Sequence, residues 1–194
     1  MGRETMQRND SSIKLIVLVF AGPNGSGKTT VTKSISTFGT YVNADDLKIE
    51  YNLTDVEAAK AADVLRNDLL NKGVDFSFET VLSTERNLLL MQRAKALGYE
   101  VKCIYVLTCD ENINILRVRE RVKSGGHDVP ENKIRGRYHR ALALLPKVVS
   151  VCDNIIIYDN SQTPEKILSK GDERMNIYPN HCWTEADIRK LIGI

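Results

Sequence analysis

A strongly apolar run, Ile13–Ala21 (IKLIVLVFA), leads directly into the glycine-rich segment GPNGSGKTT at Gly22–Thr30. Aliphatic and aromatic residues without polar alternation are typical of a strand that is buried on both faces of a parallel sheet. The residues after the glycines favour a short helix through Ile35. A buried strand, a glycine loop and a helix in immediate succession predict an α/β fold.

Strand-like and helix-like segments alternate along the rest of the chain. Further strands are expected at 41–42, 74–79, 101–107 and 154–158. Helices are expected between them, from a capping box at Thr54–Glu57 to Leu70, from Ser83 to a stop at Gly98, over 110–124, and from Asp128 as cap with Pro130 in the first turn. Strands separated by helices predict βαβ crossovers and a parallel sheet.

The chain length suits one domain. Residues 1–12 are polar and are expected to form a flexible N-terminal arm, which leaves 13–194 as a single α/β domain. After Pro164 the pattern weakens. Residues 166–178 favour a hairpin that turns at Gly171-Asp172, and Thr184 favours the cap of a last helix.

The glycine-rich segment satisfies the pattern G-x-x-x-x-G-K-[ST], the P-loop. Its glycines let successive backbone N–H groups turn toward one point, where they can cradle phosphate oxygens. The start of the next helix favours the same anion. Lys28 is expected to reach the terminal phosphates of ATP, and the Thr29 hydroxyl to ligate Mg²⁺. The predicted nucleotide-binding residues are Gly22, Pro23, Asn24, Gly25, Ser26, Gly27, Lys28, Thr29 and Thr30.

Carboxylates stand at the ends of two expected strands. Asp45 and Asp46 follow the second strand, and Glu79-Thr80 ends the third. A kinase needs a carboxylate that accepts the proton of the acceptor hydroxyl in line with the γ-phosphate. Asp45 is the candidate base, and Asp46, Glu79 and Thr80 are candidate substrate contacts. A helix-capping turn for the aspartates and a strand-end turn for Glu79 remain open alternatives.

The segment 117–140 is strongly basic. It holds eight Lys or Arg against three acids, a local balance of +5, whereas the whole chain carries +2. Two basic helices joined by a Gly125-Gly126 turn predict a mobile lid over a triphosphate. Their like charges are expected to hold the helices apart without nucleotide. Arg121 and Arg137 are the candidates for clamping the γ-phosphate, although most arginines here are expected to form a solvated face.

Two other nucleotide-hydrolysing classes fit less well. A GTPase would carry N-K-x-D, and the nearest text, Asn132-Lys133-Ile134-Arg135, lacks the aspartate. A motor-type ATPase needs an acid after a strand beside the P-loop strand. Asp159 ends an apolar strand, but it is the fifth one, and a strand-ending turn is the better interpretation.

Bulk properties exclude some further classes. The net charge of +2 implies no general attraction to nucleic acid or anionic lipid. The sequence shows no run of the ~18 apolar residues needed for a membrane span, and its N-terminus does not have the form of a signal peptide. The four cysteines, at 103, 109, 152 and 182, show neither metal spacing nor a C-x-x-C motif. A cytoplasmic location is expected.

These pieces, in this order, resemble the zeta-toxin-like family of P-loop proteins over roughly residues 14–161. The matching texts are FAGPNGSGKTT, YVNADDL, FSFETVLST, LGYEVKCIYVL, RVRERVKSGGHDVPENKIRGRY and IIIYDNS. The resemblance implies a three-layer α/β/α kinase fold with strand order 2-3-1-4-5. It also implies Lys28 on phosphate, Asp45 as general base, Glu79 on the acceptor and Arg121 as a lid arginine. The toxins phosphorylate UDP-N-acetylglucosamine with ATP, and a small antitoxin occludes their nucleotide site.

The chain departs from the toxins in two places. Where they carry a further lid arginine it has Gly126-His127-Asp128, so that Arg135 or Arg137 must substitute or transfer is weaker. The region from Pro164 on matches poorly. The favoured function is an ATP-dependent kinase of a small-molecule hydroxyl. The alternatives are a slow ATPase or nucleotide-gated regulatory protein without acceptor, and a kinase of polynucleotide ends, against which the scarcity of aromatics near the lid counts.

Overall fold

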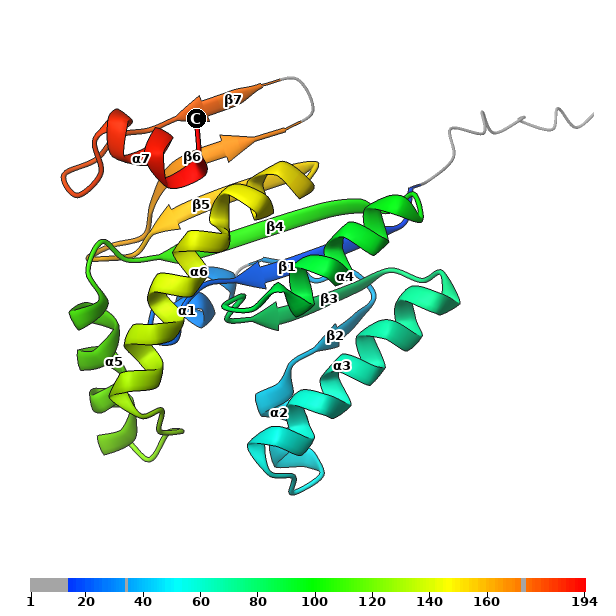
Figure 1. Ribbon diagram of the computed structural model, residues 1–194. Helices are drawn as coiled ribbons and strands as arrows, with labels where there is room; N and C mark the ends of the chain where they lie inside the picture. The colour runs from blue at the N-terminus through cyan, green and yellow to red at the C-terminus, as the bar shows by residue number, and fades with distance from the viewer. Residues whose placement is uncertain (1–13, 34, 172–173) are drawn as a thin grey trace, which may run out of the picture.

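The computed structural model describes residues 14–33, 35–171 and 174–194, so the N-terminal arm expected over 1–12 lies outside the described residues. Within these ranges the strands form a seven-stranded sheet in the order β2-β3-β1-β4-β5-β6-β7 (Figure 1). The strands are β1 (Ile16–Ala21), β2 (Thr40–Val42), β3 (Phe76–Thr80), β4 (Glu100–Leu107), β5 (Asn154–Asp159), β6 (Glu165–Lys170) and β7 (Met175–Ile177).

The first five strands are parallel and follow the order 2-3-1-4-5, which confirms the expected kinase-type sheet. β1 lies at the centre, since Val19 pairs with Phe78 of β3 on one side and with Cys103 of β4 on the other. Residues 17–21 are at most 3% exposed, as a strand buried on both faces requires. The C-terminal hairpin of β6 and β7 extends the sheet in antiparallel fashion.

Helices cover both faces of the sheet and make three layers. They are α1 (Lys28–Thr32), α2 (Ala44–Glu50), α3 (Asp55–Lys72), α4 (Glu85–Ala96), α5 (Glu111–Lys123), α6 (Glu131–Val151) and α7 (Glu185–Ile192). Figure 1 shows α3, α4, α6 and α7 across the face turned to the viewer, with α1 behind the sheet. Among the described residues, no helix is long and apolar enough to cross a membrane.

The local signals explain most helix boundaries. Thr54 and Glu57 form the expected capping box at the start of α3, and Thr184 forms one with Asp187 at α7. Asp110 caps α5 by accepting a hydrogen bond from the Asn112 N–H. These caps satisfy N–H groups that have no partner inside the helix.

Two expectations about helices were wrong, and one short helix was missed. The helix after the glycine loop ends at Thr32 and does not continue to Ile35. α6 begins at Glu131 with Pro130 itself at the N-cap, so Asp128 does not cap it and Pro130 is not in the first turn. The short helix α2 was not predicted as a helix. It contains no buried residue, and it therefore has no apolar periodicity that a sequence could display.

Candidate nucleotide and phosphoryl-transfer site

The glycine loop joins the carboxyl end of β1 to α1 and is closely packed. A Cβ atom on Gly22 would overlap the carbonyl oxygen of Val106, and one on Gly25 would overlap the carbonyl oxygen of Asn114. Both glycines also have positive φ angles, 145° and 76°, in the range that side-chain-bearing residues rarely adopt. The backbone therefore has the cradle form that the P-loop motif predicts, and this form depends on glycine.

Distant elements hold this loop in place. The Asn114 side chain in α5 donates to the Asn24 carbonyl at 2.7 Å, and the Asn160 side chain after β5 donates to the Ser26 carbonyl at 2.8 Å. The Ser26 hydroxyl is fully buried and has no hydrogen-bond partner among the described residues. A rigid cradle with an unpaired donor fits a bound phosphate group.

Lys28 lies at the centre of the site. Its ammonium donates to the carbonyls of Gly22 at 2.9 Å and Pro23 at 3.3 Å, and it lies 3.7 Å from a Glu79 oxygen. Burial lowers the pKa of Lys28, the charges of Glu79 and Asp45 oppose this, and Arg121 adds to it. Glu79, Asp45 and Arg121 are thus close enough to Lys28 to act on its charge, which brings three predicted site residues together around the fourth.

The acidic side of the site is built from β2, β3 and α2. Asp45 and Asp46 are in the first turn of α2, and the cap residue Asn43 accepts a hydrogen bond from the Asp45 N–H at 3.0 Å. Both aspartates are exposed. Burial and then the charge of Asp45 raise the pKa of Asp46. The helix-capping turn therefore exists, and the two carboxylates at its start remain available for chemistry.

Glu79 and Thr80, at the end of β3, differ in their surroundings. Glu79 accepts a long hydrogen bond of 3.4 Å from the Tyr41 hydroxyl and faces Lys28. The Thr80 hydroxyl accepts from the Leu82 N–H at 3.0 Å and from the Asn87 side chain at 2.7 Å. These two bonds hold the turn into α4, so Thr80 has a structural task whether or not it also contacts substrate.

The basic segment forms an antiparallel pair of helices, α5 and α6. Ile115, Val118, Val129 and Ile134 make a small apolar cluster between the two helices. The helices are packed together, which corrects the expectation that their like charges hold them apart. Glu131 within the basic segment and Glu111 outside it neutralise arginines that lie between the two helices.

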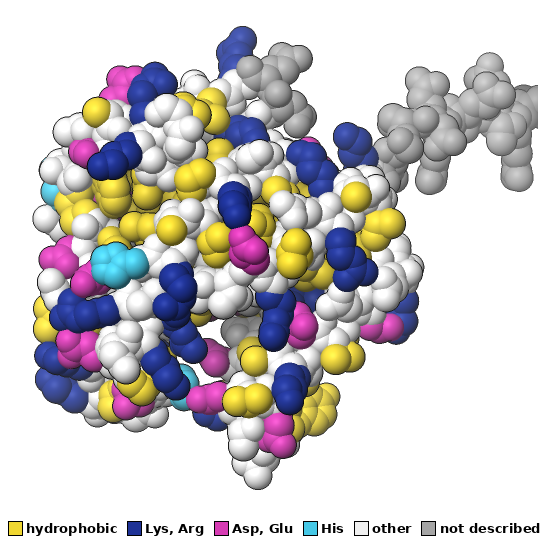
Figure 2. All heavy atoms as spheres, viewed as in Figure 1, with side chains coloured by type: hydrophobic (Ala, Val, Ile, Leu, Met, Phe, Trp, Pro, Cys, Tyr) yellow, Lys and Arg dark blue, Asp and Glu magenta, His cyan; other side chains and the backbone are white. Residues whose placement is uncertain are grey.

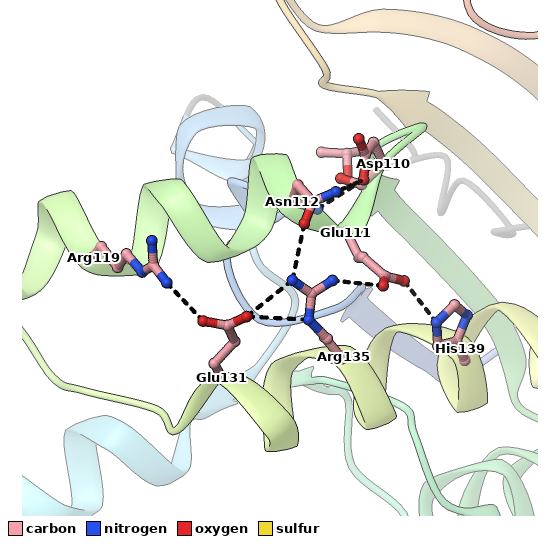
Figure 3. Close-up of polar contacts among 8 residues, drawn as sticks. Asp110, Glu111, Asn112, Arg119, Glu131, Arg135 and His139 are labelled. Atoms are coloured by element: carbon pink, nitrogen blue, oxygen red, sulfur yellow. Dashed lines mark hydrogen bonds and ion pairs between the residues drawn. The ribbon is translucent and has the colours of Figure 1, made fainter.

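Arg135 is the centre of this neutralisation (Figure 3). Its guanidinium contacts Glu111 at 2.8 Å, Glu131 at 2.9 Å and Asn112 at 3.0 Å. Arg119 contacts the second Glu131 oxygen at 2.7 Å. These carboxylates raise the pKa of Arg135. Arg135 therefore links α5 to α6, and its guanidinium is held by Glu111 and Glu131.

Arg137 points the other way, toward the loop. Its guanidinium donates to the Asn24 side chain at 3.1 Å, across 113 positions of sequence. Arg121 is exposed near the lid turn.

At the tip of the lid, the His127 ring lies 3.5 Å from the Lys48 ammonium and 4.0 Å from a carboxylate oxygen of Asp55. The lid tip therefore reaches α2 and α3 across the site. Figure 2 shows a hollow between the α5–α6 pair and the helices α2 and α3, with charged side chains around it.

Besides Asn114, two further neighbours of the loop were not assigned from the sequence. Arg117 donates to the Ser161 carbonyl at 3.2 Å, and its other terminal nitrogen is buried, unpaired among the described residues, and 3.7 Å from the position of a Cβ on Gly27. Asn160 holds Ser26. Both residues are in segments that carry the family resemblance, but no local spacing relates them to the P-loop.

Asp159 takes no part in the site. It is 1% exposed and accepts hydrogen bonds from Ser161 and, at 2.9 Å, from the Asn180 side chain. Its strand β5 is separated from the P-loop strand β1 by β4. These contacts agree with the strand-ending turn and not with a metal-site acid of a motor-type ATPase.

The fold and the loop define a P-loop protein of the kinase type. A family model described as Zeta toxin matches residues 38–171, more than half of the chain, and the chain belongs to this family. The P-loop itself precedes the matched segment. A protein of Haemophilus influenzae described as uncharacterized is 29% identical over 127 residues, which cover 62% of this chain and 91% of that protein.

Two solved structures share the fold. The AvrRxo1-ORF1:-ORF2 complex with ATP superposes with a TM-score of 0.70 and 16% identity over 94% of this chain. This chain spans 64% of that chain's length, less than two thirds. The PezAT toxin-antitoxin system of Streptococcus pneumoniae superposes with a TM-score of 0.57 and 16% identity, over 97% of this chain and 87% of that one. At such identities the likeness concerns the fold.

Proposed function

We propose that the protein is an ATP-dependent phosphotransferase that moves the γ-phosphoryl group of ATP to a hydroxyl group of a small molecule. The observation that carries this proposal is the arrangement around Lys28. Its ammonium contacts the glycine loop and faces Glu79, the charges of Asp45 and Arg121 act on it, and Arg137 contacts Asn24 of the same loop. Membership of the zeta toxin family supports the same activity.

The loop Gly22–Thr30 is the proposed site of the ATP phosphates. Lys28 now donates to two loop carbonyls and would turn its ammonium to the terminal phosphates. Thr29 is exposed at the start of α1, where its hydroxyl can ligate Mg²⁺. Mg²⁺ would neutralise phosphate charge and orient the γ-phosphoryl group. The fold of the ATP complex of AvrRxo1 supports this assignment.

On the acceptor side, Asp45 is the proposed general base and would take the proton of the attacking hydroxyl. Asp46, Glu79 and Thr80 are proposed to orient the acceptor. Arg121 and Arg137 would stabilise negative charge on the transferring group, because Arg137 contacts Asn24 of the loop and the charge of Arg121 acts on Lys28. Acidic groups on one side and cations on the other suit transfer from an anion to a neutral hydroxyl.

The chemical class of the acceptor and the protein partner are proposed from the family and the fold. A nucleotide sugar such as UDP-N-acetylglucosamine is supported by the family and by the toxin fold of PezAT. An antitoxin partner is supported by the same comparison, because the PezAT structure is that of a toxin-antitoxin system.

A slow ATPase or nucleotide-gated regulatory protein without an acceptor is the second candidate. The observation that favours it is the absence of a toxin-like arginine at Gly126–Asp128, with Arg135 committed to Glu111 and Glu131. If Arg121 and Arg137 together do not stabilise the transferring phosphoryl group, water would be the main acceptor.

The test is transfer of label from γ-labelled ATP into a metabolite extract, followed by mass identification of the labelled product. A labelled metabolite that disappears with the Lys28→Met variant is expected. UDP-N-acetylglucosamine is assayed separately as a pure acceptor. Release of free phosphate at the same rate with and without extract would exclude the kinase and support the slow ATPase.

A further inference from the structure

Two cysteines that are far apart in sequence meet at the surface. Cys109 follows β4 and precedes the cap residue of α5, whereas Cys182 is in the loop between β7 and α7. Their Sγ atoms are 3.0 Å apart, across 73 positions of sequence. A disulfide bond measures about 2.05 Å, so a small side-chain movement would close the remaining gap.

Both loops hold their cysteine in place independently of this contact. The Cys109 N–H donates to the Ser161 hydroxyl at 2.8 Å, and the Cys182 N–H donates to the Asn180 side chain at 3.0 Å. Asn180 in turn donates to Asp159 and Glu165, each at 2.9 Å. The two sulfurs therefore face each other because the surrounding backbone is anchored.

The pair is accessible to a reagent in solution. Cys109 is exposed and Cys182 is partly exposed, whereas Cys103 and Cys152 are buried in the core. Within the described residues, no group of three or more His, Cys, Asp or Glu side chains could hold a metal ion. A two-thiol site of this kind has oxidation as its natural chemistry.

We propose that Cys109 and Cys182 form a reversible intramolecular disulfide, which makes this junction a thiol-disulfide modification site. The oxidant is a low-molecular-weight disulfide, RSSR. The Cys109 thiolate attacks one sulfur of RSSR, forms a mixed disulfide and releases one RSH after protonation. The Cys182 thiol then loses its proton, displaces the second RSH and closes the bond. Two protein thiols and RSSR become one protein disulfide and two RSH.

The order of these two steps follows from the exposure of the two cysteines. The adjacent Cys109 sulfur, followed by partial burial and the charge of Asp159, raises the pKa of Cys182 to about 11. Cys182 acts second, once Cys109 carries the mixed disulfide. Cys109 is the more exposed sulfur and meets the oxidant first.

The bond would clamp the C-terminal hairpin and α7 to the start of α5. The side chain of Asn114, on the first turns of α5, holds the Asn24 carbonyl of the P-loop at 2.7 Å. Because the closed loop is long, chain-entropy arguments predict a rise of roughly 5–15 °C in melting temperature on oxidation.

The test uses the full chain with oxidised glutathione and measures intact mass under denaturing conditions. The parent should lose two hydrogens and return to the original mass with a reducing agent. The tryptic peptides 103–117 and 175–189 should be linked, and fragmentation of the linked pair should place the bond between Cys109 and Cys182. Cys182→Ser should instead accumulate one glutathione on Cys109. The matched control Cys152→Ala, which removes a buried thiol, should form the disulfide as the parent does.

These readouts need no catalytic activity, so they are independent of the proposed kinase function. The proposal fails if the parent keeps both thiols, if each cysteine binds its own glutathione, or if cross-links join separate chains. Equal melting temperatures of the oxidised and reduced parent would contradict the clamp.

Discussion

The ammonium of Lys28 is buried against the carbonyls of Gly22 and Pro23, so this residue both holds the loop and supplies the site with a charge. Lys28→Met keeps the apolar stem and removes the charge, so the fold should survive. The clamp on a transferring phosphoryl group would be lost, and we expect phosphoryl transfer to fall at least ~10²-fold. Turnover of ATP, together with a circular dichroism spectrum to check the fold, measures this. Turnover at the parent rate would refute the assignment of the loop.

Asp45 and Asp46 are neighbours on the same first turn and allow a matched comparison. An in-line general base contributes about 10²–10⁴-fold in rate, so Asp45→Asn should lower kcat by that factor with little change in ATP affinity. Asp46→Asn should cost less. Both are exposed, so neither variant leaves a buried unpaired group. Steady-state kinetics on the identified acceptor measure the two values, and the reverse order would assign the base to Asp46.

At the scale of elements, α6 carries two arginines, Arg135 and Arg137, that are two positions apart and have different tasks. Arg137→Ala removes the contact with Asn24 and should lower transfer far more than ATP binding, because the clamped charge develops in the transition state. Arg135→Ala removes the link to Glu111 and Glu131 and should lower the melting temperature more than Arg137→Ala does. Kinetics and thermal melts on both variants measure this. Equal kinetic losses at unchanged stability would contradict the division of tasks.

The lid as a unit should respond to nucleotide. Its tip rests on Lys48 and Asp55 through His127, a contact among exposed side chains that can open at little cost. ATP with Mg²⁺ should favour the closed arrangement by drawing Arg121 and Arg137 inward. We expect slower hydrogen exchange over 117–140 with a non-hydrolysable ATP analogue. Exchange that does not change would mean a static basic surface and would favour the slow ATPase.

The elements that the sequence predicted are those whose signal is local. Apolar strands and the caps at Thr54 and Thr184 depend on residues within one turn of each other, and they were found where expected. The P-loop cradle is local in the same sense. The contact of Arg137 with Asn24 crosses 113 positions and that of Cys109 with Cys182 crosses 73, and no spacing in one sequence encodes such contacts.

At the scale of the whole molecule, the C-terminal segment shares the main core. Ile167 and Leu168 of β6 and Ile188 and Ile192 of α7 are at most 4% exposed and belong to the same apolar cluster as β1. Lys170 also donates to the Val149 carbonyl at 2.6 Å and to the Cys152 carbonyl at 2.8 Å, at the end of α6. The segment that resembles the toxins least is therefore joined to the sheet by the same kind of packing as the rest.

The single domain predicted over 13–194 should unfold as one cooperative unit, and Ile188 tests this prediction directly. Its side chain is fully buried, so Ile188→Ala should lower the free energy of unfolding by about 2–5 kcal/mol through lost burial and the cavity left behind. Ile194→Ala is the matched control, since that side chain is 62% exposed and its loss should cost less than about 0.5 kcal/mol. Urea titration followed by circular dichroism and by the fluorescence of Trp183, which packs against the core, measures both. A shift of the Trp183 signal alone, with the bulk transition at the parent midpoint, would show that β6, β7 and α7 unfold separately from the sheet.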